Sequence, residues 1–281
     1  MTSMRMLLVA VLGLAGCTRA DPGNGEQYFG PNDRANECWN ANTSDIPTST
    51  LGRRIVACDR SHEYETYHVG EIDPTADEGT AITAAAQLCA QEADKLLGAP
   101  YLTGRVELRW YPDTKTINGK PHRWIACVVA ETRSMAKKLV VARTSSLRGV
   151  LAQSGPMTIQ CVNRVSDGDT LIDFTYLPNC GDPHSGEFVG LARLEDTDGH
   201  PPATRDELRA SGTRACGATV SGYLGVPEGR VPGELMPLWA SPTAEEIQRG
   251  FRSVRCFVAV RGDKHLTRMI KGIGTEPLIL T

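Results

Sequence analysis

Eight cysteines in two sets of four constrain the fold of this chain more than any other feature. The sets are Cys38, Cys58, Cys89 and Cys127, then Cys161, Cys180, Cys216 and Cys256. Successive cysteines are separated by 20, 31 and 38 residues in the first set and by 19, 36 and 40 in the second. Because both order and spacing recur, the pattern predicts one structural unit that is present twice in tandem.

The N-terminal residues predict export and a lipid anchor. Arg5 is followed by the apolar run Met6–Leu14 and then by Leu14-Ala15-Gly16-Cys17. A charged residue, a short apolar run and small residues before a cysteine are typical of a lipoprotein signal peptide, and the run is too short to span a bilayer. We therefore expect residues 1–17 to be a signal peptide that ends at lipidated Cys17, which carries an acyl chain such as palmitate. An ordinary signal peptide with an incidental cysteine is the alternative.

The predicted location and the charge restrict the partners. A lipid on Cys17 would hold the protein on the extracytoplasmic face of the cell membrane. The chain has 30 Lys and Arg against 33 Asp and Glu. This balance argues against nucleic acid or an anionic membrane surface as the main partner, because either favours a basic face. We expect contact with the membrane through the lipid alone.

Oxidised cysteines are expected in an exported chain. Four cysteines allow three pairings, and the sequence leaves the pairing open within each set. The alternative is a zinc site, since Cys58-x3-His62 and Cys180-x3-His184 each offer two ligands. Structural zinc sites usually contain a second close pair of ligands, and here the next cysteines lie more than 30 residues away. We expect disulfides, and neither a metal nor another cofactor.

Four other residues follow the same register as the cysteines. Two tryptophans stand 17 residues before the last cysteine of each set, and two arginines stand four residues before it: Trp110, Trp239, Arg123 and Arg252. We expect the tryptophans to be core or edge anchors, with stacking on a peptide or glycan as the alternative. The repeat predicts a domain at 37–150 and a homologous domain at 156–281, after a polar tether at 18–36.

The secondary-structure signals of the two copies are similar. Residues 54–57, 64–72 and 124–130 read as strands in the first copy, and 170–176, 187–194 and 254–260 in the second. A helix is predicted at Thr80–Leu97. Its counterpart in Pro201–Gly225 is expected to be interrupted at Gly212 and Gly217. The predicted fold class is α+β: two tandem homologous domains, each a mainly antiparallel sheet with a packed helix, stapled by disulfides.

A Cys-x3-His-x2-Glu pattern contains the residues that most resemble a chemical site. It places His62 near Glu65 and His184 near Glu187. A carboxylate can orient an imidazole for acid–base catalysis, so an envelope hydrolase or a metal-dependent enzyme is one alternative. A catalytic pair is needed once, however, whereas a structural loop recurs in every copy. We expect a structural role and no enzyme activity. A small-ligand-binding lipoprotein with an apolar pocket within or between the copies is the other alternative.

These residues resemble the septum formation domain of actinobacterial exported and membrane proteins. The resemblance is best at Cys58-Asp59-Arg60-Ser61-His62, at Cys180-Gly181-Asp182-Pro183-His184, from Trp239 to Cys256, and at Ser145–Gly149. It extends over two tandem copies. It implies a non-catalytic cell-envelope lipoprotein connected with septum formation and cell division, whose partner is an unknown cell-envelope or division protein. It implies no active-site residues.

Overall fold

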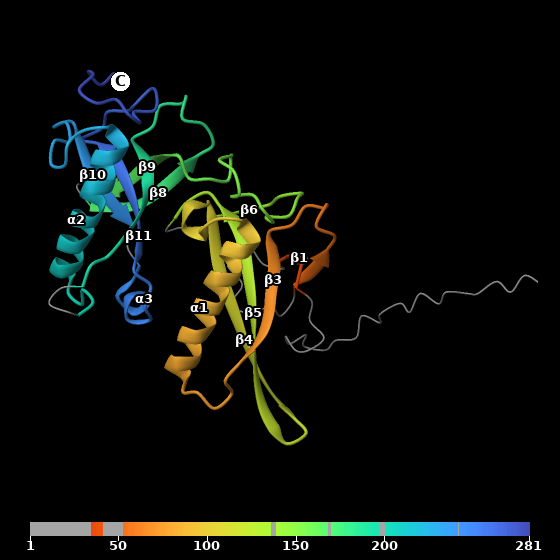
Figure 1. Ribbon diagram of the computed structural model, residues 1–281. Helices are drawn as coiled ribbons and strands as arrows, with labels where there is room; N and C mark the ends of the chain where they lie inside the picture. The colour runs from red at the N-terminus through yellow and green to blue at the C-terminus, as the bar shows by residue number, and fades with distance from the viewer. Residues whose placement is uncertain (1–34, 42–52, 136–138, 168–169, 197–199, 241) are drawn as a thin grey trace, which may run out of the picture.

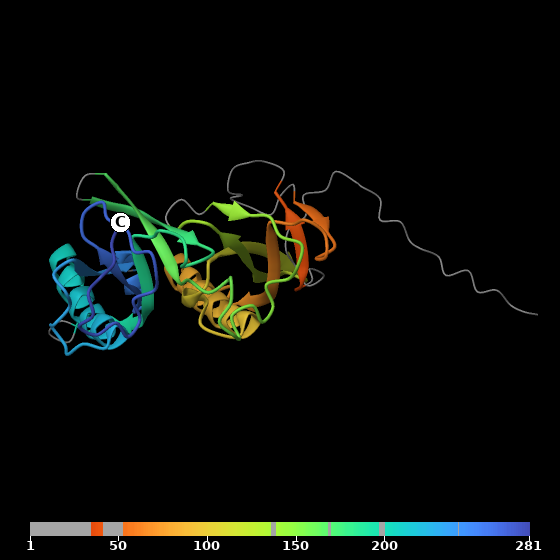
Figure 2. The ribbon, with the colours of Figure 1, turned by 90° about the horizontal axis from the view of Figure 1, so that it is seen from above.

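The computed structural model describes residues 35–41, 53–135, 139–167, 170–196, 200–240 and 242–281 (Figure 1). The predicted signal peptide, Cys17 and all but the last two residues of the predicted tether lie outside the described residues. We call residues 35–150 the first half and 156–281 the second half. The two halves lie side by side in both views of the ribbon (Figure 2).

The first half is built on an antiparallel sheet. Its strands are β1 (Glu37–Asn40), β2 (Arg54–Val56), β3 (Tyr64–Ile72), β4 (Val106–Ile117), β5 (Lys120–Thr132) and β6 (Val140–Val141). The order is β2-β1-β3-β5-β4, and β6 pairs with β5. Helix α1 (Glu78–Leu97) packs against β3, β4 and β5, and a 3-10 turn, η1 (Tyr101–Thr103), follows it.

The second half contains a second antiparallel sheet. Its strands are β7 (Cys161–Asp167), β8 (Thr170–Leu177), β9 (Gly186–Arg193), β10 (Leu235–Ala240) and β11 (Ser253–Val260). Helix α2 (Arg205–Leu224) packs against β9, β10 and β11, and a short helix, α3 (Ala244–Gln248), precedes β11. The sheet order is β10-β11-β9-β7-β8. Read from β8, this is the order of the first sheet, strand for strand.

Four disulfides stabilise the two sheets, as the cysteine pattern predicted. In each set the first cysteine pairs with the second and the third with the fourth: Cys38–Cys58, Cys89–Cys127, Cys161–Cys180 and Cys216–Cys256. The Cα–Cα distances of 5.1–5.4 Å lie within the usual range for a disulfide. The second bridge of each set joins the long helix to the strand in the sheet on which it packs, so helix and sheet are held together covalently.

Local sequence explains where the long helices begin and end. The Asp77 side chain caps the start of α1, and the left-handed Gly98 ends it. The predicted end at Leu97 is confirmed, and the helix begins two residues before the predicted Thr80. At α2, Thr204 and Glu207 form a capping box. None of the helices in the described part of the chain has the length and hydropathy needed to cross a membrane.

The predicted interruption of α2 is wrong, because the helix continues through Gly212 and Gly217. At Gly212 the missing side chain makes room for Trp239. A Cβ there would lie 2.6 Å from the indole Nε1. Close packing on a neighbouring ring therefore explains this glycine, and a helix break does not.

The halves differ where the polypeptide passes from the fourth strand to the fifth. In the first half, β4 and β5 form a long hairpin that extends beyond the rest of the sheet (Figure 1). Asn118 and Gly119 have φ values of 51° and 77°, which suit the tight turn at its tip. In the second half α3 occupies this position in the chain, and β10 is only six residues long.

Backbone hydrogen bonds join the two halves. The Arg105 N–H donates to the carbonyl of Met157 at 2.9 Å, and the Tyr176 N–H donates to that of Arg133 at 2.9 Å. Met157 also belongs to the buried apolar cluster beneath α1. The start of the second half is thus part of the core of the first.

Candidate functional site

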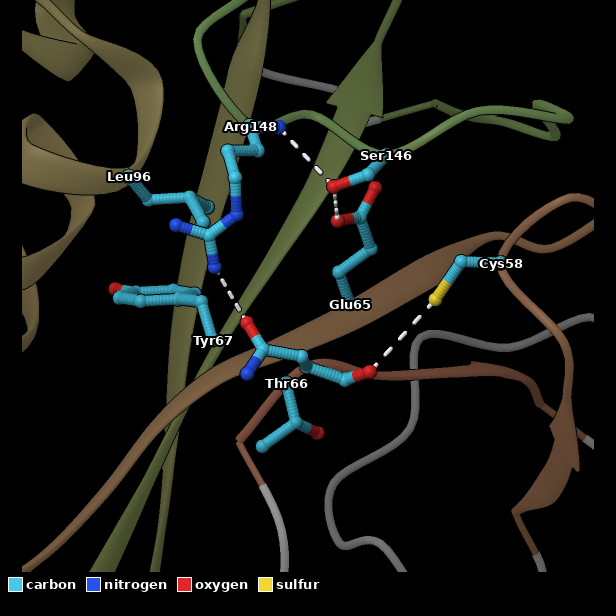
Figure 3. Close-up of a pocket in the computed structure, with 8 residues that line it drawn as sticks. Cys58, Glu65, Thr66, Tyr67, Leu96, Ser146 and Arg148 are labelled. Atoms are coloured by element: carbon cyan, nitrogen blue, oxygen red, sulfur yellow. Dashed lines mark hydrogen bonds between the residues drawn. The ribbon is translucent and has the colours of Figure 1, made fainter.

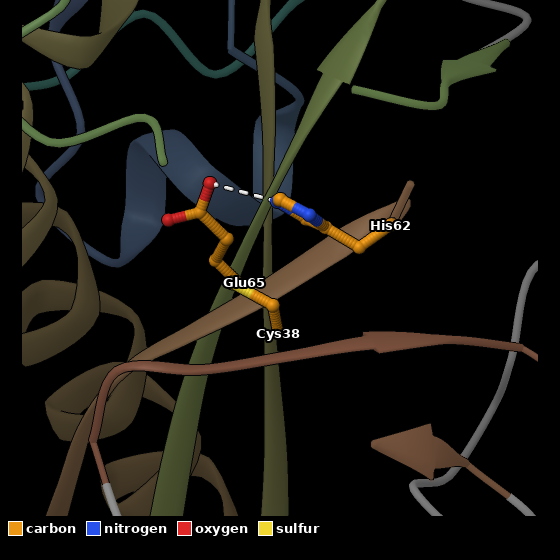
Figure 4. Close-up of side chains that lie close together, drawn as sticks. All are labelled: Cys38, His62 and Glu65. Carbon is orange, nitrogen blue, oxygen red and sulfur yellow. Dashed lines mark hydrogen bonds and ion pairs between the residues drawn. The ribbon is translucent and has the colours of Figure 1, made fainter. Parts of the chain in front are cut away.

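His62 and Glu65 form a buried pair where the polypeptide enters β3 (Figure 4). The Nδ1–H of His62 donates to the Arg60 carbonyl at 2.8 Å, and Nε2 lies 3.3 Å from Glu65 Oε1. The backbone of His62 exchanges two hydrogen bonds with that of Arg143. Glu65 Oε1 also accepts from the Leu147 N–H at 2.7 Å. The imidazole is 0% exposed. The His62 backbone and the Glu65 carboxylate together join the start of β3 to the segment at 143–147.

His184 and Glu187 repeat this geometry at β9. Nδ1–H of His184 donates to the Asp182 carbonyl at 2.8 Å, and Nε2 lies 3.1 Å from Glu187 Oε1. The backbone of His184 exchanges two hydrogen bonds with that of Leu266. Glu187 Oε1 accepts from the Ile270 N–H at 3.0 Å. Both side chains are 0% exposed.

The environment of His184 favours its charged form. Burial alone lowers the pKa of the imidazole, because it disfavours the charge. The hydrogen bond to Glu187, the hydrogen bond to the Asp182 carbonyl and the nearby Glu187 charge together outweigh this, and the pKa of His184 is raised above its ordinary value. Since a carboxylate and a carbonyl both accept, a ring with a proton on each nitrogen satisfies both partners.

Backbone contacts identify corresponding positions next to these pairs. The Gly149 N–H donates to the Leu96 carbonyl at 2.7 Å, and the Gly272 N–H donates to the Tyr223 carbonyl at 2.8 Å. Both glycines are left-handed, with φ values of 69° and 70°. Leu96 in α1 therefore corresponds to Tyr223 in α2.

The second carboxylate oxygen of each glutamate has a different partner in the two halves. The Tyr223 hydroxyl donates to Glu187 Oε2 at 2.6 Å, whereas Glu65 Oε2 accepts from the Ser146 hydroxyl at 2.8 Å. A cavity of about 390 Å³ lies beside Glu65, and Leu96 is one of the residues that line it (Figure 3). It is lined by Asn36, Cys58, Glu65, Thr66, Tyr67, Leu96, Ser146 and Arg148.

The clusters also contain potential metal ligands. One ligand atom from each of Cys38, His62 and Glu65 lies within 4.8 Å of the others, and Cys161, His184 and Glu187 form a corresponding group. In the oxidised chain neither sulfur is a thiolate, because each is joined to the next cysteine by a disulfide. The carboxylates already accept backbone and hydroxyl hydrogen bonds. Each cluster joins the start of a central strand to a later segment of its half by hydrogen bonds.

Acid–base chemistry at these histidines would require contact with a substrate. A general base must lie within hydrogen-bond reach of the proton that it removes, directly or through one water molecule. His62 and His184 are both fully buried, and both ring nitrogens of each already face a protein acceptor.

The two tryptophans of the repeat line a different feature, a cleft between the halves. Trp110 lies on the edge strand β4 opposite Cys127, and Trp239 lies on the edge strand β10 opposite Cys256. Both line a cavity of about 860 Å³, which we call the inter-half cleft. Its walls come from α1, η1 and β4 of the first half and from β8 to β11 with the α3 region of the second.

The two arginines of the repeat have different surroundings. Arg123 Nη1 donates to the Ala76 carbonyl at 3.1 Å and thereby fixes the turn before α1. Arg252 lines the inter-half cleft, where its Nη1 lies 3.9 Å from Asp196 Oδ1. Arg123 and Arg252 thus occupy equivalent places in the sequence repeat but contact different partners.

Several residues that line the inter-half cleft carry no motif. Arg193 and Arg255 are cationic, and Tyr101 and Tyr176 are aromatic. Strand alternation around 253–255 would place Arg255 and Ser253 on one face of a strand. It does not reveal that this face meets the other half of the molecule.

A comparison with known protein families matches residues 35–256 to a family described as septum formation. The chain belongs to the septum formation family. The match is one span that runs through both halves and covers well over half of the chain. In the septum formation protein described here, that span includes all eight paired cysteines, both His–Glu pairs and the residues that line the inter-half cleft.

Two further comparisons gave no relatives. No curated protein matches this septum formation chain, and no solved structure matches it.

Proposed function

We propose that the protein is a lipid-anchored cell-envelope protein that acts in septum formation and cell division by binding a partner. The observation that carries this proposal is the family match over residues 35–256. Two features agree with an extracytoplasmic location. The Leu14–Cys17 segment is typical of a lipoprotein signal, and four disulfides persist most readily in an oxidising compartment. The partner would be an envelope or division protein.

The two halves act as non-catalytic binding modules in this proposal. The complete burial of His62 and His184 supports a structural role, since a substrate has no access to either ring. The alternative of an envelope hydrolase that uses these histidines can be tested. His62 and His184 are replaced together by Ala, and melting temperature and division phenotype are measured. Loss of stability in parallel with loss of function supports the structural role. Loss of function with an unchanged melting curve supports catalysis.

We also propose that the halves are tandem homologous domains, at residues 37–150 and 156–281. Three correspondences support a shared ancestor: the sheet order, the pairing of the disulfides, and the hydrogen bonds of the two His–Glu pairs. Such self-similarity is the usual mark of a duplicated unit.

Localisation and depletion in the native host test the main proposal. A fluorescent fusion is expected to concentrate at the division site, and depletion is expected to delay or misplace septa. A Cys17→Ala variant is expected to leave the membrane fraction, because it cannot be acylated. Uniform distribution together with normal septa on depletion would refute the link with septum formation.

A small-ligand-binding protein is the second candidate function. The inter-half cleft of about 860 Å³ favours it, because small-molecule sites usually occupy about 300–1,000 Å³ and often lie between domains.

A further inference from the structure

The inter-half cleft contains arginines with unused hydrogen-bond donors. The Arg193 side chain donates to no described residue and is exposed. Arg252 Nη1 is buried and has no hydrogen-bond partner among the described residues. Arg255 donates through Nε to the Leu102 carbonyl at 2.7 Å, while its terminal nitrogens donate to no described residue. A guanidinium has five N–H donors, so this wall keeps a surplus of cationic donors.

Two of these arginines lie on the same face of the second sheet. Arg193 on β9 is directly opposite Ser253 on β11, and Leu191 is opposite Arg255. Arg193 and Arg255 are therefore diagonal neighbours, whose side chains leave the sheet on one side about 7–8 Å apart. Long side chains at this spacing reach a single anionic group between them.

The carboxylates of the first half are already engaged. Asp94 Oδ1 accepts from the Tyr101 N–H at 2.7 Å, and burial raises the pKa of this carboxyl. Glu107 lies 3.6 Å from Arg109 Nη2 in an ion pair within its own strand. Neither carboxylate bonds a guanidinium of the opposite wall in these contacts.

The carboxylates of the second half are engaged as well. Asp173 is 2% exposed and accepts from the Phe174 N–H at 2.7 Å. Glu246 Oε2 accepts from the Thr243 N–H at 2.7 Å as part of the capping box of α3. The negative groups of the cleft thus have local partners. Arg252 lies 3.9 Å from Asp196 and Arg255 uses only its Nε, so Arg193, Arg252 and Arg255 keep N–H groups that no described residue accepts. A bound anion would complement these N–H groups.

Aromatic side chains form the rest of the lining. Trp110, Tyr101 and Tyr176 lie in the cleft, and Tyr176 is only 5% exposed. No described residue hydrogen-bonds the Tyr176 hydroxyl. Its ring and that of Tyr101 are buried enough that desolvation raises both phenol pKa values, that of Tyr101 to about 12. Each hydroxyl therefore stays protonated and can donate.

We propose that the inter-half cleft binds an acidic sugar, with the carboxylate held by Arg193, Arg252 and Arg255. The sugar ring lies against the aromatic lining, and its hydroxyls meet the Tyr176 hydroxyl. Arginine matches a carboxylate in a bidentate geometry, and aromatic faces accommodate the apolar face of a ring. The choice of a sugar of the cell envelope rests on the proposed function, whereas the preference for an anion rests on the cleft alone.

Two amino sugars that differ only in an acidic substituent test this proposal. Binding of N-acetylmuramic acid and of N-acetylglucosamine to the full mature chain is measured by calorimetry and by tryptophan fluorescence. The acidic sugar is expected to bind at least about tenfold more tightly, because a charge-assisted hydrogen bond contributes about that much. Equal affinity for the two sugars, or no binding of either, would overturn the proposal.

Variants locate the binding. Arg193→Gln and Arg252→Gln are each expected to weaken the binding of N-acetylmuramic acid by about tenfold. Arg230→Gln, an exposed residue outside the cleft, is the matched control and is expected to bind as wild type. Unchanged melting temperatures show that the variants fold. Wild-type affinity in both cleft variants would contradict the assignment. These measurements do not depend on septal localisation, so the proposed function and this proposal can fail separately.

Discussion

His184 shows how one buried side chain resolves opposing electrostatic effects. Desolvation opposes its charge, and the Glu187 carboxylate with the Asp182 carbonyl favours it. The net rise in pKa means that the folded state binds a proton more tightly than the unfolded chain does. That stabilisation is fully present below the unfolded value of about 6.5 and is lost as the pH rises through the raised folded value.

Stability is therefore expected to fall as the pH increases above about 6.5 because His184 loses its proton. The free energy of unfolding is measured by urea denaturation between about pH 5 and pH 9. A His184→Gln variant is expected to show a weaker dependence on pH over this range. The same slope in wild type and variant would show that His184 does not carry the effect.

The corresponding hydroxyls at Tyr223 and Ser146 allow a matched comparison. Burial and the Glu187 charge raise the pKa of Tyr223, so the phenol remains a donor to that carboxylate. Tyr223→Phe is expected to destabilise the protein by about 1–3 kcal/mol, because it removes a short hydrogen bond to a buried carboxylate and leaves that oxygen only the longer bond from the Ile270 N–H. Ser146→Ala is expected to cost less, because the cavity beside Glu65 admits water. Chemical denaturation of both variants measures the difference, and a larger loss for Ser146→Ala would contradict it.

At the scale of elements, α2 shows that one glycine is required while another is not. Gly212 lies against the Trp239 indole, whereas a Cβ at Gly217 would meet nothing within 4 Å. From sequence alone both glycines are predicted to break the helix, because glycine has a low intrinsic helix propensity. This propensity takes no account of Trp239, which comes from a later strand and packs on Gly212. At Gly212 the contact with Trp239 therefore decides which residue fits. At Gly217 no such contact exists, and helix propensity decides.

Alanine at these two positions is expected to have opposite effects. Gly212→Ala forces the indole or the helix to move and is expected to cost about 1–3 kcal/mol. Gly217→Ala is expected to stabilise the protein by up to about 1 kcal/mol, because alanine favours a helix interior. Thermal unfolding of the two variants provides the measurement. A stabilised Gly212→Ala would mean that the ring does not limit this position.

The sequence predicted a good part of the fold and little of the cleft. Repeated cysteines and strand periodicity predicted two mainly antiparallel sheets, each with a packed helix, and the predicted end of the first helix at Leu97 is confirmed. The cysteine pairing needed the strand order, which spacing alone does not provide. The grouping of Arg193 with Arg255 depends on the register of β9 and β11 and on which face meets the first half. Neither the register nor the choice of face produces a local pattern in the sequence.

For the whole molecule, the shared core and hydrogen bonds between the halves imply cooperative unfolding. Met157 packs beneath α1, and the Ile159 N–H donates to the Thr103 carbonyl at 2.8 Å. A substitution that destabilises one half should therefore also lower the stability of the other. Multi-domain chains without such contacts usually unfold in separate steps.

Removal of the Cys161–Cys180 bridge tests this coupling. The bridge joins cysteines 19 residues apart, so a double Cys→Ser variant is expected to lose about 3 kcal/mol of stability. Hydrogen exchange is expected to rise in β5 as well as in β11, and heat is expected to give a single transition. Wild-type protection of β5 in the variant would show that the halves unfold independently.

Two side chains that connect the halves bind atoms that every amino acid possesses. Gln87 Nε2 donates to the main-chain oxygen of Arg249 at 2.9 Å, and Arg255 donates to that of Leu102. The acceptors would persist through almost any replacement at positions 102 and 249, whereas each donor depends on its own side chain. As relatives diverge, Gln87 and Arg255 should be retained together while the residues opposite them drift, so this contact would be recognisable in a set of homologues from one side only.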